Sequence, residues 1–275
     1  MNRLTFLCDI AGRVSKESQL DRFFTVGGAI IPTGTENILS TAIGADTPKW
    51  RDTDDRHLSL IVEVLRDFKV NCTVVKIEKA EPAWTAFWNA GDQLFQYLSS
   101  RTKPKPGFAK PANILKDWAF GKCLATSLGL YLKSEGTPII LDPDGFSALC
   151  LRVICDTEIQ GEENREVFAD NWKHWSEITK LTPRLGIKPY IESIEFETEQ
   201  KQNLLLLPDY LAGYMHYSSE PSRIAPPAKL SERGLEGFAR ALSGLVKFDS
   251  IQYLFDEAFP NLTTAPTRPD KAPAG

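Results

Sequence analysis

The chain has 275 residues and a mass of 30.7 kDa, with 42% hydrophobic and 25% charged residues. This composition is ordinary for a globular protein with a substantial core, so it excludes disorder as the default state and favours one domain with insertions. The net charge of −4 and the pI of about 5.6 argue against a nonspecific nucleic-acid binder, because such proteins usually carry a global excess of positive charge.

Cysteine usage and the N-terminal region indicate a reducing compartment. The five cysteines are odd in number, widely spaced and mostly within apolar runs, which is typical of reduced core thiols: Cys8, Cys72, Cys123, Cys150 and Cys155. The N-terminal apolar run is too short for a signal peptide, and no segment reaches the roughly 20 apolar residues needed to span a bilayer. We therefore expect a cytoplasmic protein that has no membrane segment.

The first apolar run, Leu4 to Cys8, stops at the carboxylate of Asp9. A polar loop over residues 12–21 then leads to a second apolar run over 23–31, which predicts two antiparallel strands. Within the second run, Gly27-Gly28 indicates a bulge or a close backbone approach. An acid at the end of a central strand lies at the rim of a sheet, where acids from distant segments can join it around a metal ion.

The following segments predict a turn-rich stretch, two helices and a strand. Residues 32–47 are rich in turn formers, and apolar residues then recur at helical spacing over 58–68. The β-branched run over 70–77 predicts a strand. Aromatic residues dominate a helical stretch over 82–99, which we interpret as core, with no cofactor needed.

A basic, proline-rich segment over 101–111 cannot be the interior of a helix and is expected to be an exposed loop. It is either a solvated linker or a cationic loop that rests on phosphate oxygens. A long buried helix is expected after it, from an N-cap at Asn113 to about Lys133.

A second carboxylate follows a predicted strand in the middle of the chain. The apolar run over 137–141 ends at Asp142, ahead of a turn that contains Asp144. Residues 146–182 are expected to be mainly helical, and residues 187–198 to form a strand.

A third carboxylate lies on a predicted helix over 204–217, whose first turn accepts Pro208. Asp209, Ala212, Gly213 and His216 share one face of this helix, and small residues beside an acid let that face approach the strand ends. After a proline-rich break we expect a helical pair over 230–259. These boundaries predict a domain over 1–220, a C-terminal helical extension over 221–260 and a disordered tail over 261–275.

The element order predicts an α/β fold: a ribonuclease H-like mixed β-sheet flanked by helices, with helical insertions and a helical C-terminal extension. Three motifs sharpen this interpretation, namely Asp9-x-x-Gly12, Lys49-Trp50 ahead of a helix, and Leu205-x-x-x-Asp209-x-Leu211-Ala212-Gly213. Together with Asp142 after an apolar strand, they resemble the domain of unknown function 3800 family over roughly residues 4 to 217. That family is regarded as ribonuclease H-like.

The resemblance implies a metal-dependent hydrolase. Phosphodiester cleavage of the two-metal type needs several hard oxygen ligands around Mg²⁺ or Mn²⁺. In this interpretation Asp9 bridges the ions, Asp142 holds one ion, and Asp209 closes the site. The further candidates are a fourth ligand, a phosphate contact and a histidine on the helix face of Asp209: Asp117 or Asp144, Lys49 and His216.

Three functional hypotheses remain open. The first is a Mg²⁺- or Mn²⁺-dependent nuclease that acts on DNA or RNA. The second is a degenerate ribonuclease H-like protein that binds or regulates, because Ile10 replaces a glutamate of the family pattern and Pro208 falls where that pattern has alanine. Its aromatic segments over 84–95 and 168–175 would then contact nucleic acid or another protein. The alternatives for a partner also include a homo-oligomer. The third is a non-nucleic-acid metallohydrolase, which requires an enclosed apolar pocket.

Overall fold

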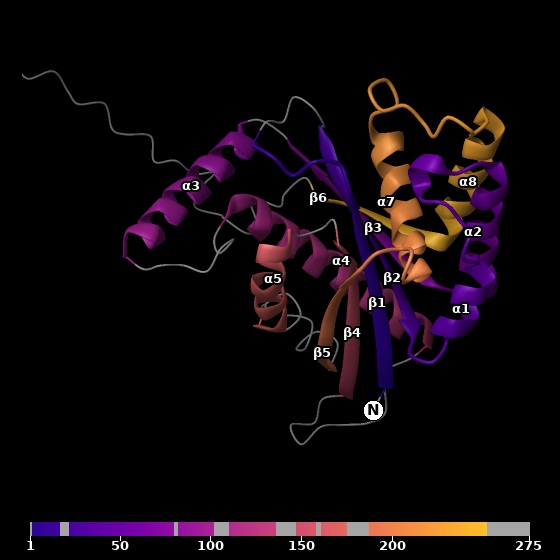
Figure 1. Cartoon of the computed structure of the whole chain (residues 1–275), viewed down its shortest axis with the longest axis horizontal. Helices are drawn as coiled ribbons and strands as arrows, with labels where there is room; N and C mark the ends of the chain where they lie inside the picture. The colour runs from indigo at the N-terminus through magenta and orange to yellow at the C-terminus, as the bar shows by residue number, and fades with distance from the viewer. Residues whose placement is uncertain are drawn as a thin grey trace, which may run out of the picture.

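The computed structural model describes residues 2–16, 22–79, 82–101, 110–135, 147–157, 161–174 and 187–251. In this part of the chain a six-stranded mixed sheet lies between two layers of helices (Figure 1). The strands run in the order β5-β4-β1-β2-β3-β6 across the sheet. Their bounds are β1 Asn2–Ala11, β2 Phe23–Pro32, β3 Asn71–Glu78, β4 Ser147–Asp156, β5 Ile187–Glu197 and β6 Val246–Ile251.

Strand β2 runs opposite to the other five strands. It pairs antiparallel with β1 and β3, whereas the pairs β1–β4, β4–β5 and β3–β6 are parallel. The carboxyl ends of β1, β4 and β5 therefore meet at one edge of the sheet. Residues that follow these three strands come from distant parts of the sequence and lie near one another.

Helices cover both faces of the sheet (Figure 1). One layer contains α1 Glu36–Ile43, α2 Asp55–Asp67, α7 Leu206–Ser219 and α8 Glu232–Leu245, with the short 3₁₀ turns η1 Trp50–Asp52 and η3 Asn203–Leu205. The other contains α3 Ala83–Arg101, α4 Pro111–Glu135 and α5 Glu162–His174. Among the described residues, no helix is both long and apolar enough to cross a membrane.

Each face of the sheet has its own core, because successive side chains of a strand point to opposite sides. On β1, Phe6 and Cys8 belong to the core beneath α3, α4 and α5. Leu7 belongs to the core beneath α1, α2, α7 and α8. Strand β1 is thus buried on both faces, and the acid that follows Cys8 points to the α7 face.

The glycine pair on β2 allows helices to approach the sheet closely from both sides. A Cβ atom on Gly27 would lie 2.3 Å from the carbonyl oxygen of Pro208 on α7, and one on Gly28 would lie 2.6 Å from Sγ of Cys123 on α4. The β1–β2 register runs without a shift at these residues. Of the two interpretations of Gly27-Gly28, the structure therefore shows the close approach, with no bulge.

Three segments differ from the sequence-based expectation. Residues 36–43, expected to be turns, form α1, which buries only Leu39 and Ile43. Residues 147–156, expected to be helical, form β4. The apolar residues of this strand follow one another without the helical or alternating spacing that would distinguish a helix from a strand. Residues 246–251, expected to continue a helical pair, form β6, which pairs with β3 at the edge of the sheet.

The other described elements agree with the expectation in type. Helix α4 begins at Pro111, two residues before the expected cap, and proline is favoured at the first helical position. The aromatic side chains proposed as contact surfaces are buried where they are described, which contradicts that role: Trp84, Phe87, Trp88 and Phe168. The expectations for residues 102–109, 137–146 and 252–275 lie outside the described residues.

Candidate metal centre

Two buried carboxylates lie at neighbouring strand ends. Cys8 on β1 and Cys155 on β4 are partners in the parallel pairing, so the next residues, Asp9 and Asp156, also lie side by side. Both follow their cysteine by one position and therefore point to the α7 face of the sheet. Asp9 is 7% exposed and Asp156 is 2% exposed, so two acids are held together away from bulk water.

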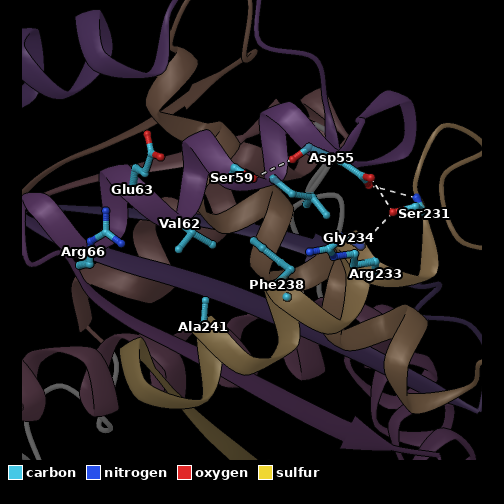
Figure 2. Close-up of a pocket in the computed structure, with 12 residues that line it drawn as sticks. Asp55, Ser59, Val62, Glu63, Arg66, Ser231, Arg233, Gly234, Phe238 and Ala241 are labelled. Atoms are coloured by element: carbon cyan, nitrogen blue, oxygen red, sulfur yellow. Dashed lines mark hydrogen bonds between the residues drawn. The ribbon is translucent and has the colours of Figure 1, made fainter.

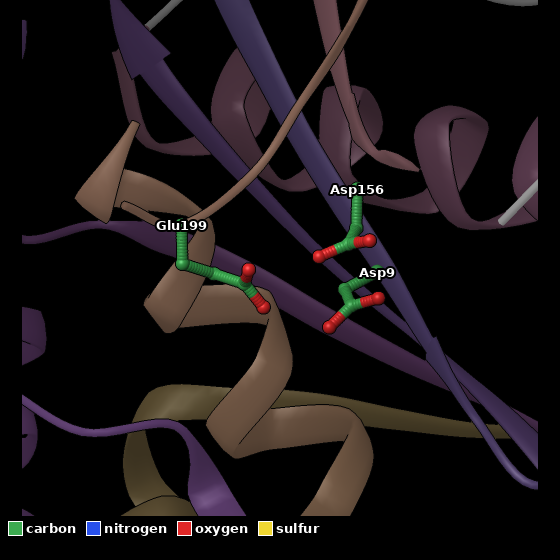
Figure 3. A group of neighbouring side chains, drawn as sticks. All are labelled: Asp9, Asp156 and Glu199. Carbon is green, nitrogen blue, oxygen red and sulfur yellow. The ribbon is translucent and has the colours of Figure 1, made fainter. Parts of the chain in front are cut away.

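Glu199 completes a group of three. It lies in the turn that follows β5 and is 7% exposed. Asp9, Asp156 and Glu199 each offer one oxygen atom, and these atoms all lie within 4.8 Å of one another. Figure 3 shows the three carboxylates converging from β1, β4 and the segment that leads into α7. We call these three residues the acid cluster.

Asp209 lies in the first turn of α7, beside the acid cluster. The backbone N–H of Trp50 donates a 2.7 Å hydrogen bond to its Oδ2 atom. Burial raises the pKa of Asp209 to about 7; the charges of Glu199 and Asp156 add to this rise, and the Trp50 hydrogen bond and the charge of Lys49 oppose it.

The same effects act on Asp9. Burial, and then the charges of Asp209 and Asp156, hold the pKa of Asp9 well above its usual range. Four carboxyl groups within one partly dry site cannot all ionise without a compensating cation.

A lysine supplies part of that compensation. Lys49 places its ammonium 2.6 Å from Oε1 of Glu199 and 3.8 Å from Oδ2 of Asp156. Burial alone would raise the pKa of Glu199, but hydrogen bonds with Lys49 and Asp156 outweigh it, so that this pKa is lowered. Within the described residues, the site therefore consists of four acids and one ammonium group.

Small residues on α7 bring Asp209 to this position. A Cβ atom on Gly213 would lie 2.3 Å from the Trp50 ring, so only glycine allows this contact. The hydroxyl of Thr25 on β2 donates a 2.9 Å hydrogen bond to the carbonyl of Ala212. The helix therefore lies directly on the sheet, and Asp209 in its first turn reaches the ends of the strands.

The structure brings together some of the sequence-predicted residues and separates others. Asp9, Asp209 and Lys49 meet at the site. Asp117 is buried on α4, which covers the opposite face of the sheet. His216 is near the other end of α7, where its Nε2 atom would lie 2.8 Å from a Cβ atom on Gly12.

Asp142 and Asp144 lie outside the described residues, and the acid that the structure places beside Asp9 is Asp156. Asp156 is not among the sequence-predicted residues, although a signal is present: Val153-Ile154-Cys155-Asp156 repeats the pattern of Phe6-Leu7-Cys8-Asp9, an apolar strand that ends on an acid. Glu199 is not among them either, and it has no local signal, since this residue follows a strand already rich in glutamate.

The donor set of the acid cluster suits a hard divalent cation. Mg²⁺, Mn²⁺ and Ca²⁺ prefer carboxylate oxygens, and a cation among buried acids relieves their mutual repulsion. The cluster contains neither histidine nor cysteine as a donor, which disfavours zinc. The chain thus carries a group of three buried acids that fits a divalent metal ion.

A separate groove of 410 Å³ lies between α2 and α8. Figure 2 shows Val62, Phe238 and Ala241 between the two helices, with Asp55 accepting hydrogen bonds from Ser231 at one end. None of the acids of the cluster lines this groove. It is therefore not the enclosed apolar pocket beside the acids that a small-molecule metallohydrolase requires.

Comparison with known proteins adds little to this description. None of the protein-family models compared matches the chain, and none of the curated proteins compared matches it. Among solved structures, the complex of PCNA with RNase HII from Archaeoglobus fulgidus aligns over 88% of this chain and 89% of that chain, with 12% sequence identity and a TM-score of 0.38. A likeness at this level carries no argument about fold details or activity.

Proposed function

We propose that the protein is a metal-dependent nuclease that hydrolyses phosphodiester bonds of DNA or RNA on a ribonuclease H-like fold. The observation that carries this proposal is the convergence of Asp9, Asp156 and Glu199 within 4.8 Å at the carboxyl ends of β1, β4 and β5. The strand order with an antiparallel β2 supports the ribonuclease H-like interpretation, and so does the motif resemblance to the domain of unknown function 3800 family. The proposal retains Asp9 and Asp209 as site residues and adds Asp156 and Glu199.

In this proposal the acid cluster holds Mg²⁺ or Mn²⁺, which supplies a polarised water and charge stabilisation at a phosphate. The chain's own residues define the site around that ion. Burial at 2–7% exposure keeps Asp9, Asp156 and Glu199 out of bulk water, which strengthens their interaction with a cation. Asp209 closes the site from α7, where the Trp50 N–H fixes its orientation.

The test compares the wild-type protein with Asp9→Asn, which keeps the size of the side chain and removes its charge. Wild-type protein should cleave single-stranded or double-stranded DNA or RNA when Mg²⁺ or Mn²⁺ is added, and EDTA should stop the reaction. We expect Asp9→Asn to lose cleavage and the rise in melting temperature that metal causes. Absence of both cleavage and metal stabilisation in the wild-type protein would refute the proposal.

One observation favours a second candidate function, a ribonuclease H-like binding or regulatory protein without catalysis. Lys49 already neutralises part of the acid cluster, and a fully compensated cluster needs no metal. This candidate predicts that nucleic acid or a protein partner binds equally well in EDTA and in Mg²⁺. Binding that depends on metal, followed by cleavage, would contradict it.

A further inference from the structure

The ammonium group of Lys49 is held inside the acid cluster by its neighbours in the sequence. Tyr210 on α7 donates its hydroxyl hydrogen to the carbonyl of Pro48 at 2.9 Å. On the other side, the N–H of Trp50 binds Asp209 at 2.7 Å. The backbone is thus anchored to α7 immediately before and after Lys49, so the lysine side chain starts from a fixed point.

Packing fixes the same segment further. Trp50 is 9% exposed, and its ring contacts Tyr210, Tyr214 and Phe238 at centroid separations of 6.1 to 6.2 Å. Gly213 lies directly against this ring. Because the backbone at Lys49 is already fixed, only the rotamer freedom of its side chain is lost when the ammonium binds the acids.

The position of the ammonium matters for any metal ion. It contacts Glu199 at 2.6 Å and Asp156 at 3.8 Å. Two-metal sites hold their ions about 3.5 to 4 Å apart and share carboxylates between them. An ammonium group on two carboxylates of the cluster repels a cation placed at the same oxygens and reduces the negative charge available to it.

We propose that Lys49 takes the place of one cation, so that the acid cluster binds one divalent ion and not two. This inference rests on the proposed function, because it assumes that the cluster binds metal. It assigns Lys49 the role of a fixed counter-ion that sets the metal stoichiometry of the site. Asp9, whose oxygen lies within 4.8 Å of those of Asp156 and Glu199, is then a ligand of the single metal.

The experiment measures bound Mn²⁺ per chain by electron paramagnetic resonance and by isothermal titration calorimetry. We expect one Mn²⁺ in the wild-type protein and two in Lys49→Met, which keeps the length of the side chain and removes its charge. Lys49→Arg should retain one ion, because it restores a cation. The matched control is Lys201→Met, which removes an exposed ammonium that lies 3.7 Å from Oε2 of Glu197 and should leave one ion.

A second readout detects folding defects in the variants. In EDTA, Lys49→Met should melt at a lower temperature than wild type, because the acids lose a counter-ion. Mn²⁺ should then raise its melting temperature by more than it raises that of wild type. Lys49→Gln, a second neutral variant, should behave in the same way if the methionine variant does not fold.

The outcomes separate the two proposals. Two ions in the wild-type protein, or one ion in both the wild type and the neutral variants, would overturn the role of Lys49 and leave the proposed nuclease intact. No Mn²⁺ in the wild-type protein would overturn the proposed function, and the role of Lys49 would fall with it. A second ion in Lys201→Met would also overturn the role of Lys49, since the effect would then be one of general charge.

Discussion

The two faces of the sheet carry different side-chain chemistry at adjacent residues of the same two strands, β1 and β4. Cys8 and Cys155 lie side by side with their sulfur atoms 3.2 Å apart in the apolar core beneath α4. One residue further along the same two strands, Asp9 and Asp156 lie side by side on the α7 face. Burial holds the pKa of Cys8 well above its usual value, so the thiol stays neutral.

Burial alone does not determine whether a pair of side chains needs a cation. Both pairs are almost fully buried, but the thiols have apolar neighbours, whereas the acids have Lys49, Glu199 and Asp209. A neutral pair needs only packing, while a charged pair needs a cation. The α7 face is therefore the face on which substitutions should change metal binding.

The largest expected effect is that of Asp156→Asn, on the α7 face of the sheet. This variant removes one of three converging carboxylates, and we expect metal-dependent cleavage to fall about 1,000-fold or more. Asp142→Asn is the matched comparison, because Asp142 is the second acid that the sequence alone suggests. Cleavage rates measured with both variants decide between them: a loss confined to Asp142→Asn would show that Asp156 is not a ligand.

Substitutions of the glycine pair on β2 measure how tightly helices pack on each face of the sheet. In Gly27→Ala the new Cβ atom would meet the backbone of Pro208, which cannot move without α7, so we expect a loss of about 3 kcal/mol. In Gly28→Ala it would meet the side chains of Cys123 and Phe6, which can shift, so we expect about 1 kcal/mol.

Urea unfolding of the two variants measures this difference. Gly27→Ala should also weaken metal binding, because α7 carries Asp209, and Gly28→Ala should not. Equal losses of stability in the two variants would mean that α7 is no more tightly packed against β2 than α4 is.

The pH dependence of stability in metal-free protein tests the raised pKa of Asp209. Its folded-state pKa of about 7 lies above the usual 3.8, so its contribution to stability is full below about pH 4 and is lost as the pH rises through 7. About 3 pKa units correspond to at most ~4 kcal/mol, and we expect about 2 kcal/mol because Asp209 is partly exposed.

Asp209→Asn should therefore be more stable than wild type at pH 8 in EDTA and equally stable at pH 4. Some pH dependence should remain in this variant, because the raised pKa of Asp9 acts in the same direction. Denaturant melts at the two pH values measure the difference. An unchanged gap between the proteins across this range would contradict the assignment of a raised pKa to Asp209.

The smallest expected effect is that of Cys155→Ala, on the face of the sheet that α3, α4 and α5 cover. Cys155 is fully buried, so the loss of its sulfur should cost about 1 kcal/mol in unfolding free energy. Mn²⁺ binding should not change, although Asp156 is the next residue. A changed metal affinity in this variant would show that the two faces are coupled through β4.

Much of the fold could be predicted because its elements carry local signals. The apolar run before Asp9 and the alternation of β5 indicate strands, and the spacing of apolar residues in α2 indicates a helix. Strand β4 carries no such period, because it is buried on both faces. Its sequence therefore does not distinguish a strand from the helix that we expected there. Strand β6 was missed because only its pairing with β3, more than 170 positions earlier, defines it.

The candidate site was predictable only in part, for a related reason. Asp9 and Asp209 lie beside features that local patterns reveal: a strand end and a helix face with small residues. Glu199 lies in a turn, and its closeness to Asp9 depends on the order of strands in the finished sheet. The ion pairs of Lys49 depend on how α7 anchors Pro48 and Trp50, which no local pattern contains.

The spread of the site along the chain has a consequence for synthesis. Its acids come from positions 9, 156, 199 and 209, so a growing chain carries Asp9 long before any partner exists. The site assembles only after more than 200 residues have left the ribosome, β4 has paired with β1 and β5 has paired with β4. Because long-range pairings form late in folding, a chain that stops before Asp209 cannot bring these four acids together, and the site exists only once the segment that carries Asp209 has been made.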